Sequence, residues 1–219
     1  MRINRCLTIA VICIAFAASG FAQGKEITED QYLVPWRTAL QKARGLTRRV
    51  IQTVTNHEKE MPDIDEWQYV YVMPDKVHYT NIRTFDGKVN RIEQIVIGKT
   101  KYCKKDGGIW KLSESYCIGG SGSGGPSNIA SNKYYLENKK IDGKEIKVFR
   151  NYITYTNIYS PTKATEGLTF EESIFWLNSD DLMIREEIRK GLVNLGKVRT
   201  TNLTLYTYDP NLKIEAPIK

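Results

Sequence analysis

The segment with the most evident potential for chemistry is a glycine-rich stretch near the middle of the chain. Gly120, Gly122 and Gly125 fall at the G-x-G-x-x-G spacing, which in dinucleotide-binding domains places a pyrophosphate at the start of a helix. That geometry needs a helix opening at the third glycine, whereas Pro126 follows it and the next residues resemble a strand. We therefore expect no nucleotide partner and interpret residues 119–125 as a flexible Gly/Ser loop.

Residue types that perform acid–base or metal chemistry are scattered. The two histidines, His57 and His78, have no neighbouring ligands or triad partners in the sequence, so both are interpreted as surface residues. The adjacent acidic pairs lie in a turn or point to opposite faces of a strand, which favours solvated charge over catalysis; they are Glu171–Glu172, Asp180–Asp181 and Glu186–Glu187. The sequence predicts no enzyme, no metal site and no cofactor.

The N-terminus has the order of a secretory signal peptide. Arg2 and Arg5 precede an apolar run from Cys6 to Ala18, and small residues follow to Ala22, so residues 1–22 are predicted to be removed on export. No other run approaches the ~18 apolar residues of a spanning helix. We expect residues 23–219 to form one exported, soluble domain, with the periplasm of a Gram-negative bacterium as its compartment.

Two cysteines remain after the predicted signal peptide. Cys103 and Cys117 lack C-x-x-C spacing and neighbouring histidines, and an oxidising compartment favours a structural disulfide between them. A hairpin at the intervening Asp106–Gly108 would place Cys103 opposite Trp110. The chain must then double back after Lys111 to bring the sulfurs together.

The charge balance favours no particular partner. The 32 basic and 25 acidic residues give a net charge of +7, and the two charges are interspersed. Nucleic-acid binding is therefore not expected, whereas attraction to an anionic membrane surface stays open.

The elements that would position these residues are one helix and many strands. In "YLVPWRTALQKARGL", Leu33, Trp36, Leu40 and Ala43 recur at helical intervals, with Pro35 at a tolerated early position. From Arg48 onward the apolar pattern has period two. Turns are predicted at these positions: 73–76, Gly98–Lys99, Asp106–Gly108, Asp142–Gly143 and Asn178–Asp181.

This pattern predicts a mainly β (α+β) fold. Ten or eleven strands joined by tight turns are typical of a curved antiparallel meander. A meander of this length must curl, so we expect an unclosed barrel around the one N-terminal helix.

Several strands carry apolar residues on both faces, which is the pattern of a hydrophobic ligand cavity and equally of a second covering layer. Parity does not show which face is inside. The residues predicted to line the cavity are Trp67, Tyr69, Tyr71, Ile95, Ile97 and Trp176 from the strands, with Trp36 and Leu40 from the helix.

Turn and strand motifs between Arg48 and Pro217 resemble the LolA/LolB-like outer-membrane lipoprotein-sorting family. The stretches "YVMPDKVHYT", "EQIVIGKTKYCKKDGGIWKL", "IDGKEIKVFR", "SIFWLNSDDLMIREEI" and "LTLYTYDPNLKIEAP" follow one another in the order typical of that family. The resemblance implies a half-barrel around a helix, with an apolar cavity that receives acyl chains. Such motifs specify a fold more closely than an activity.

Two hypotheses for function follow. The first is a non-enzymatic envelope carrier whose partners are lipid or lipoprotein acyl chains, with a role in lipoprotein sorting and a membrane protein partner as finer options. The second is a structural or protein-interaction module of the envelope, which would have a filled core and an exposed apolar patch.

Overall fold

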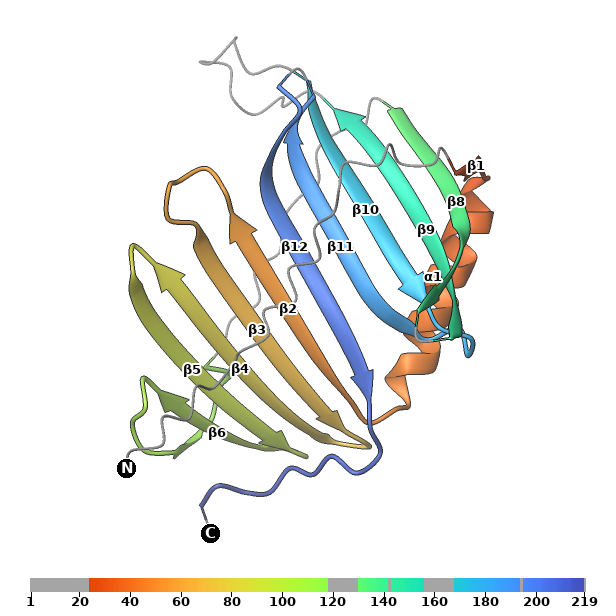
Figure 1. Ribbon diagram of the computed structural model, residues 1–219. Helices are drawn as coiled ribbons and strands as arrows, with labels where there is room; N and C mark the ends of the chain where they lie inside the picture. Colours follow the sequence, from red (N-terminus) through yellow and green to blue (C-terminus); the bar gives the residue numbers. More distant parts are fainter. Residues whose placement is uncertain (1–23, 118–129, 142, 156–167, 194, 219) are drawn as a thin grey trace, which may run out of the picture.

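The structure is a computed structural model that describes residues 24–117, 130–141, 143–155, 168–193 and 195–218. The predicted signal peptide 1–22 and the Gly/Ser loop 119–125 lie outside these residues. Within them, twelve strands form a single antiparallel sheet, and one helix packs against it (Figure 1). No helix among them is long and apolar enough to span a bilayer.

The helix α1 (Glu29–Arg44) begins three residues earlier than the apolar periodicity indicates. Thr28 accepts a hydrogen bond from the backbone N–H of Gln31, whose side chain accepts one from the N–H of Thr28, which forms a capping box. Pro35 therefore lies inside the helix rather than in its first turn, where it was expected.

The sheet consists of two meanders joined at their inner edges. Its order is β1-β8-β9-β10-β11-β12-β2-β3-β4-β5-β6-β7. One meander contains β2 (Arg48–Asn56), β3 (Asp63–Val72), β4 (Lys76–Phe85), β5 (Lys88–Ile97), β6 (Thr100–Lys105) and β7 (Lys111–Ser113). The other contains β8 (Ala130–Ile141), β9 (Lys144–Tyr155), β10 (Thr169–Leu177), β11 (Met183–Leu192) and β12 (Lys197–Tyr208), with the two-residue β1 (Lys25–Glu26) at its edge.

The pairing of β12 with β2 joins the meanders along nine residues, from Thr200 opposite Asn56 to Tyr208 opposite Arg48. The antiparallel meander that the sequence predicts is therefore divided into two halves, and the strand order departs from the sequence order where β12 meets β2. Because the two outermost strands do not pair with each other, the sheet is an unclosed half-barrel, as predicted.

Tight turns connect strands at the predicted positions 73–76, Gly98–Lys99, Asp106–Gly108 and Asn178–Asp181, and also at Asp86–Gly87, which was not predicted. Asp86–Gly87 and Asp106–Gly107 have positive φ angles at both residues (47° and 73°, 47° and 74°), the backbone of a type I′ hairpin turn. This geometry explains why Asp-Gly occupies both sites. Asp142, in the predicted Asp142–Gly143 turn, lies outside the described residues.

The main hydrophobic core lies between α1 and the second meander. It comprises Tyr32, Ala39, Phe149, Phe175, Leu177 and Met183. The rings of Phe149 and Phe175 stack with centroids 4.7 Å apart, and Tyr32 meets Phe175 edge-on at 5.2 Å. The helix contacts β8 and β11, and Figure 1 shows it behind the β8–β11 half of the sheet rather than behind β3–β6.

Candidate functional site

Strand register divides the side chains between two faces of the sheet. We call the face on which α1 packs the inner face and the opposite one the outer face. Tyr206 packs in the helix core and lies opposite Val50, which lies opposite Tyr69. Since side chains on directly opposed residues point the same way, Tyr69 belongs to the inner face, together with Trp67 and Tyr71 two residues away on the same strand.

Four aromatic residues lie side by side on the inner face of β3 and β4, and we call them the aromatic row: Trp67, Tyr69, Tyr71 and Tyr79. Ring centroids are 6.2 Å apart for Trp67 and Tyr69, and 6.2 Å for Tyr69 and Tyr71, in both cases stacked. Tyr79 meets Tyr69 edge-on at 5.5 Å. All four are half-buried, and the strands on which α1 packs, β8 to β12, form the other half of the sheet.

The phenols of the row remain neutral over the physiological range. Burial raises the pKa of Tyr69 to about 12 and also raises the pKa values of Tyr71 and Tyr79. The row therefore offers broad uncharged ring surface with hydroxyl groups that can donate and accept hydrogen bonds.

Both ends of the row carry polar groups. At one end the Arg48 guanidinium lies 4.1 Å from the centre of the Tyr71 ring and donates to the carbonyl oxygens of Ala43 and Leu46. At the other end Asp65 accepts hydrogen bonds from Asn81 and Arg83. An open hollow of ≈ 220 Å³ lies at the Asp65 end, lined by Val54, Asn56, Asp63, Ile64, Asp65, Arg83, Thr84 and Phe85.

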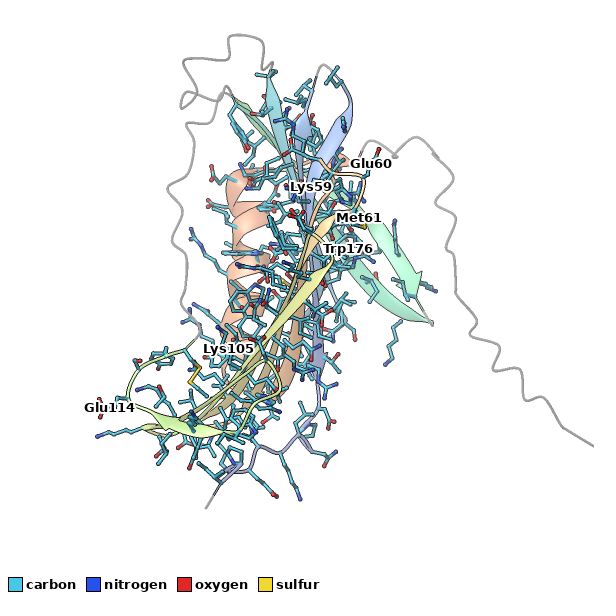
Figure 2. All side chains as sticks on the ribbon, turned by 90° about the vertical axis from the view of Figure 1, so that its left-hand side faces the viewer. Lys59, Glu60, Met61, Lys105, Glu114 and Trp176 are labelled. Atoms are coloured by element: carbon cyan, nitrogen blue, oxygen red, sulfur yellow. A yellow bond between two sulfur atoms is a disulfide. The ribbon has the colours of Figure 1, made fainter. Side chains whose placement is uncertain are left out.

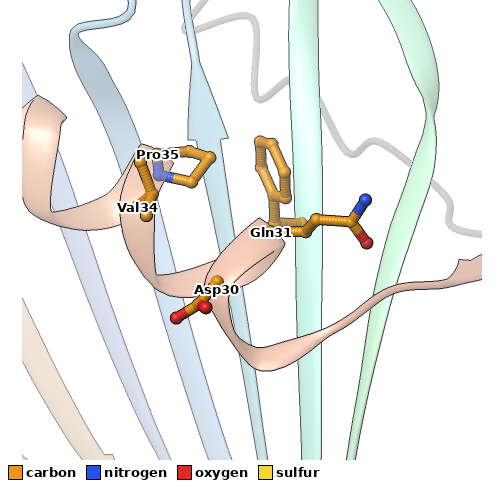
Figure 3. A pocket seen from close by; sticks show the side chains of 5 residues that line it. Asp30, Gln31, Val34 and Pro35 are labelled. Atoms are coloured by element: carbon orange, nitrogen blue, oxygen red, sulfur yellow. The ribbon is translucent and has the colours of Figure 1, made fainter.

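A second hollow, of ≈ 500 Å³, lies beside the first turns of α1 (Figure 3). Asp30, Gln31, Val34 and Pro35 line it from the helix and Phe149 from the sheet. It is also open to solvent, and the sequence analysis did not single it out. The periodicity that identified the helix marks its buried face, whereas Val34 is on the exposed side.

The structure does not bring the eight predicted lining residues together. Trp67, Tyr69 and Tyr71 share the inner face, where Trp36 and Leu40 pack in the helix core. Ile95 lies opposite His78, and His78 opposite Val70, so Ile95 and Ile97 are on the outer face. Trp176 is there too, packed against Val148 and Ile174 with the Arg185 guanidinium 4.9 Å from its ring.

Ile95, Ile97 and Trp176 were grouped with the inner-face residues because the alternation of side chains along one strand does not show which of its two faces lies beside a given face of the next strand. Val96 and Gln94, rather than the isoleucines, continue the inner face from Val77 and Tyr79. The inner-face residues that the sequence analysis did not include among the predicted lining residues in this region are thus Tyr79 and Gln94. The register of the "MPDK" hairpin, in which Tyr79 pairs with Tyr69, was the signal that could have found Tyr79.

The predicted disulfide between Cys103 and Cys117 is confirmed, with a Cα–Cα distance of 6.3 Å. Cys103 lies opposite Lys111, one residue beyond the expected Trp110, because the connection between Lys105 and Lys111 holds one residue more than a two-residue turn at Asp106–Gly107 would. After β7 the chain doubles back, and the N–H of Cys117 donates to the side chain of Gln94 at 2.9 Å. Gln94 is 1% exposed, so this contact ties the returning chain to the buried inner face of β5.

The histidines have different environments. His57 contacts the Thr201 hydroxyl at 3.1 Å. His78 is half-buried on the outer face rather than on the open surface, 3.5 Å from Glu93 and beside Trp110. Burial lowers the His78 pKa despite the neighbouring carboxylate. The described part of the chain contains no group of three or more His, Cys, Asp or Glu residues placed to hold a metal ion.

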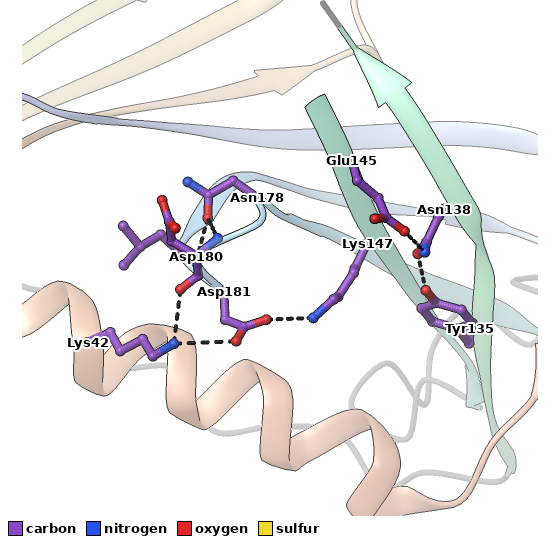
Figure 4. Close-up of polar contacts among 9 residues, drawn as sticks. Lys42, Tyr135, Asn138, Glu145, Lys147, Asn178, Asp180 and Asp181 are labelled. Carbon is purple, nitrogen blue, oxygen red and sulfur yellow. Dashed lines mark hydrogen bonds and ion pairs between the residues drawn. The ribbon is translucent and has the colours of Figure 1, made fainter. Parts of the chain in front are cut away.

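The end of α1 is held to the sheet by a polar bridge at the β10–β11 turn (Figure 4). Asp181 pairs with Lys42 of the helix at 3.4 Å and with Lys147 of β9 at 2.8 Å. The Asn178 side chain shapes the turn by accepting from the N–H groups of Asp180 and Leu182. The bridge fixes the helix over the β8–β12 half and so leaves the aromatic row free of it.

Known proteins with similar structures span nearly the whole chain. The lipoprotein LppX from Mycobacterium tuberculosis is 12% identical with a TM-score of 0.48, covering 86% of this chain and 100% of its own. LprF from Mycobacterium bovis is 13% identical with a TM-score of 0.47, covering 90% and 100%. A LolA superfamily protein from Nitrosomonas europaea is 10% identical with a TM-score of 0.25, covering 78% and 90%.

The Nitrosomonas europaea protein is described as a LolA superfamily protein, and the sequence motifs above resemble that family. Because the TM-scores of all three structures lie below 0.5, the fold assignment rests on the sheet and helix described above. No protein-family model and no curated protein matches the sequence.

Proposed function

We propose that this protein is a non-enzymatic carrier that holds an acyl chain of a lipid or lipoprotein against the inner face of its half-barrel. The single observation that carries the proposal is the aromatic row, a continuous half-buried surface on β3 and β4 in the half of the sheet away from α1. Soluble proteins rarely leave a large apolar surface without a use for it.

An acyl chain fits the chemistry of this surface. The stacked rings of Trp67, Tyr69 and Tyr71 run along one strand, and a hydrocarbon tail laid along them gains roughly 0.8 kcal/mol for each methylene it buries. The Asp65–Arg83 pair at the far end of the row supplies both charges where a polar headgroup would emerge. In this proposal Trp36 and Leu40 support the helix side of the groove instead of contacting the chain.

The proposal places the carrier outside the cytoplasm. The signal peptide expected at residues 1–22 and the disulfide between Cys103 and Cys117 both suit an oxidising compartment, with the Gram-negative periplasm as the proposed location. Sorting of lipoproteins to the outer membrane and a membrane protein partner remain finer proposals within the same function.

Binding of a fluorescent fatty acid tests the proposal, with two variants on neighbouring residues of β3. Trp67→Ser removes a ring from the row, and we expect its affinity to fall about tenfold or more because burial of a large apolar side chain is worth roughly 1.5–3 kcal/mol. The matched control is Val70→Ser, which removes an apolar side chain from the outer face of the same strand. Its affinity should stay within about twofold of wild type.

Two results would count against the carrier. One is the absence of fatty-acid binding by the wild-type protein, together with no lipid retained in native mass spectrometry of protein purified from its own envelope. The other is an equal loss of affinity in Trp67→Ser and Val70→Ser, which would move the binding surface away from the row.

A further inference from the structure

The β6–β7 hairpin, residues 100–117, presents apolar side chains to solvent in an unusual concentration. Ile109 is 76% exposed, Leu112 67% and Tyr116 61%, and all three fall within eight residues of one another. Single exposed apolar residues are common on proteins, whereas a cluster indicates a contact surface. In Figure 2 the segment between Lys105 and Glu114 stands out from the body of the sheet at the lower left.

The same segment is strongly basic. Lys101, Lys104, Lys105 and Lys111 lie in the hairpin and Lys99 directly before it, against two acidic residues, Asp106 and Glu114. Lysine stems can lie along apolar surface while their ammonium groups stay in water or among phosphates. The charge of the segment is therefore complementary to an anionic surface.

The apolar side chains point in several directions. Leu112 lies opposite Tyr102, which lies opposite Ile95, so Leu112 is on the outer face. The Tyr116 ring lies 4.9 Å from the ammonium of Lys101, whose partner Val96 belongs to the inner face. Ile109 follows the turn. A folded protein partner would have to contact both faces and the turn of the hairpin simultaneously. The fluid interface of a bilayer, by contrast, surrounds an inserted hairpin on every side.

The hairpin is held in shape before it meets any partner. The disulfide closes it, Gln94 accepts the N–H of Cys117, and the ammonium of Lys101 donates to the carbonyl of Glu114 at 3.2 Å. A segment that is already ordered loses little conformational entropy on binding.

We infer that the β6–β7 hairpin is a docking element for an anionic lipid bilayer. Ile109, Leu112 and Tyr116 enter the interfacial region, the exposed Lys105 and Lys111 pair with lipid phosphates, and the aromatic side chains lie at headgroup level, where tyrosine and tryptophan are favoured. This assignment concerns the outermost strands and is independent of what the aromatic row binds.

Vesicle flotation tests the inference on the full mature chain. The probe vesicles contain phosphatidylglycerol and phosphatidylcholine, and phosphatidylcholine alone serves as the neutral comparison. Wild type should float with the anionic vesicles and not with the neutral ones, and 0.5 M salt should weaken binding. Lys105→Gln/Lys111→Gln should weaken it about 25-fold, since each lysine near an anionic surface is worth about fivefold in affinity.

Ile109→Ser/Leu112→Ser should also lose binding to the anionic vesicles. The matched control is Met61→Ser/Leu195→Ser, at positions 69% and 66% exposed in other hairpins of the molecule, and it should bind like wild type. All these side chains are exposed, so circular dichroism should show folded variants. Fatty-acid uptake should be unchanged in the hairpin variants, and Trp67→Ser should float like wild type, which separates this inference from the carrier proposal.

Three outcomes would overturn the inference. Absence of wild-type flotation with anionic vesicles would exclude the bilayer and leave an acidic protein surface as the occupant. Equal binding to neutral vesicles would remove the role of the lysines. An equal loss in the Met61→Ser/Leu195→Ser control would show that the contact is not specific to the hairpin.

Discussion

Glu186 and Glu187 are adjacent in β11, yet their environments act on them in opposite directions. Glu186 lies on the inner face, where its carboxylate accepts a hydrogen bond from the Trp36 indole at 3.4 Å, and burial raises its pKa. Glu187 lies on the outer face between Arg185 and Arg189, at 2.7 and 2.5 Å. Burial also acts to raise the Glu187 pKa, but the two arginines outweigh it, so that pKa is lowered.

These directions give opposite pH dependences of stability. A raised folded pKa means that the Glu186 carboxylate destabilises the fold above that pKa, and the cost is relieved as pH falls through it. A lowered folded pKa means that Glu187 stabilises the fold above the ordinary glutamate pKa, and this contribution is lost as pH falls through the lowered value. As pH falls, protonation of Glu186 therefore removes an unfavourable contribution to stability, whereas protonation of Glu187 removes a favourable one.

Replacing each carboxylate by an amide tests this reading. At pH 7 we expect Glu187→Gln to lower the free energy of unfolding by about 2 kcal/mol, because two charge-assisted hydrogen bonds are weakened. Glu186→Gln should raise it modestly, because an amide is cheaper to bury. Urea denaturation between pH 3 and 8 is the measurement. Both differences should shrink toward the acid end, and equal changes of one sign at pH 7 would contradict the argument.

At the scale of elements, the sequence predicts those features that depend on residues close together along the chain, namely turns, the helix and individual strands. Most of the turns, the helix and eleven of the strands were identifiable, whereas the turn at Asp86–Gly87 was not predicted. The missing strand is the two-residue β1, Lys25–Glu26, which is too short for a period to show. The start of α1 was misplaced because Pro35 was taken as an early helix residue. The T-x-x-Q pattern from Thr28 to Gln31 is a start signal that outweighs it.

Pairing between distant strands was beyond the same reasoning. Nothing local indicates that β12 inserts beside β2, and the inner face of each strand follows from such pairings. The aromatic row was therefore found as a stripe on one strand, Trp67 to Tyr71, while Ile95, Ile97 and Trp176 were grouped with it although their strands present them on the outer face.

The disulfide is expected to matter mainly to the two strands it closes. Its cysteines are 14 residues apart, and a closed loop of that size adds up to about 3 kcal/mol to the free energy of unfolding. Cys103→Ser/Cys117→Ser should lower stability by no more than this. Hydrogen exchange should accelerate in β6 and leave β10 and β11 unchanged. Reduced wild type should behave like the variant, and uniform acceleration over the whole sheet would contradict a local role.

At the scale of the whole molecule, the two halves of the sheet are stabilised differently. The β8–β12 half has α1 packed on it, with Phe175, Leu177 and Met183 almost fully buried. The β2–β7 half has the half-buried aromatic row on the same face. An acyl chain on the row would supply to this half the apolar contact that the helix supplies to the other.

Ligand-dependent hydrogen exchange tests that division. A bound ligand at about 100 times its dissociation constant stabilises the state that binds it by roughly 2.7 kcal/mol. With a fatty acid in excess, amides of β3 and β4 should gain protection, whereas those of β10 should change little because their core is already complete. Protection confined to β9 and β10 would instead place the ligand in the hollow beside Phe149.

The unclosed sheet also affects the tendency of the protein to associate with copies of itself. A barrel that does not close keeps two borders with unsatisfied backbone groups, each able to recruit a strand from another molecule. One border ends in β7, which has three residues, and the other in β1, which has two. The register irregularity between Leu136 and Lys139, followed by Lys140, also disturbs the long edge of β8. Three features therefore hinder the edge-to-edge pairing of half-barrels into fibrils: the short terminal strands, the irregular edge of β8 and the lysines along it.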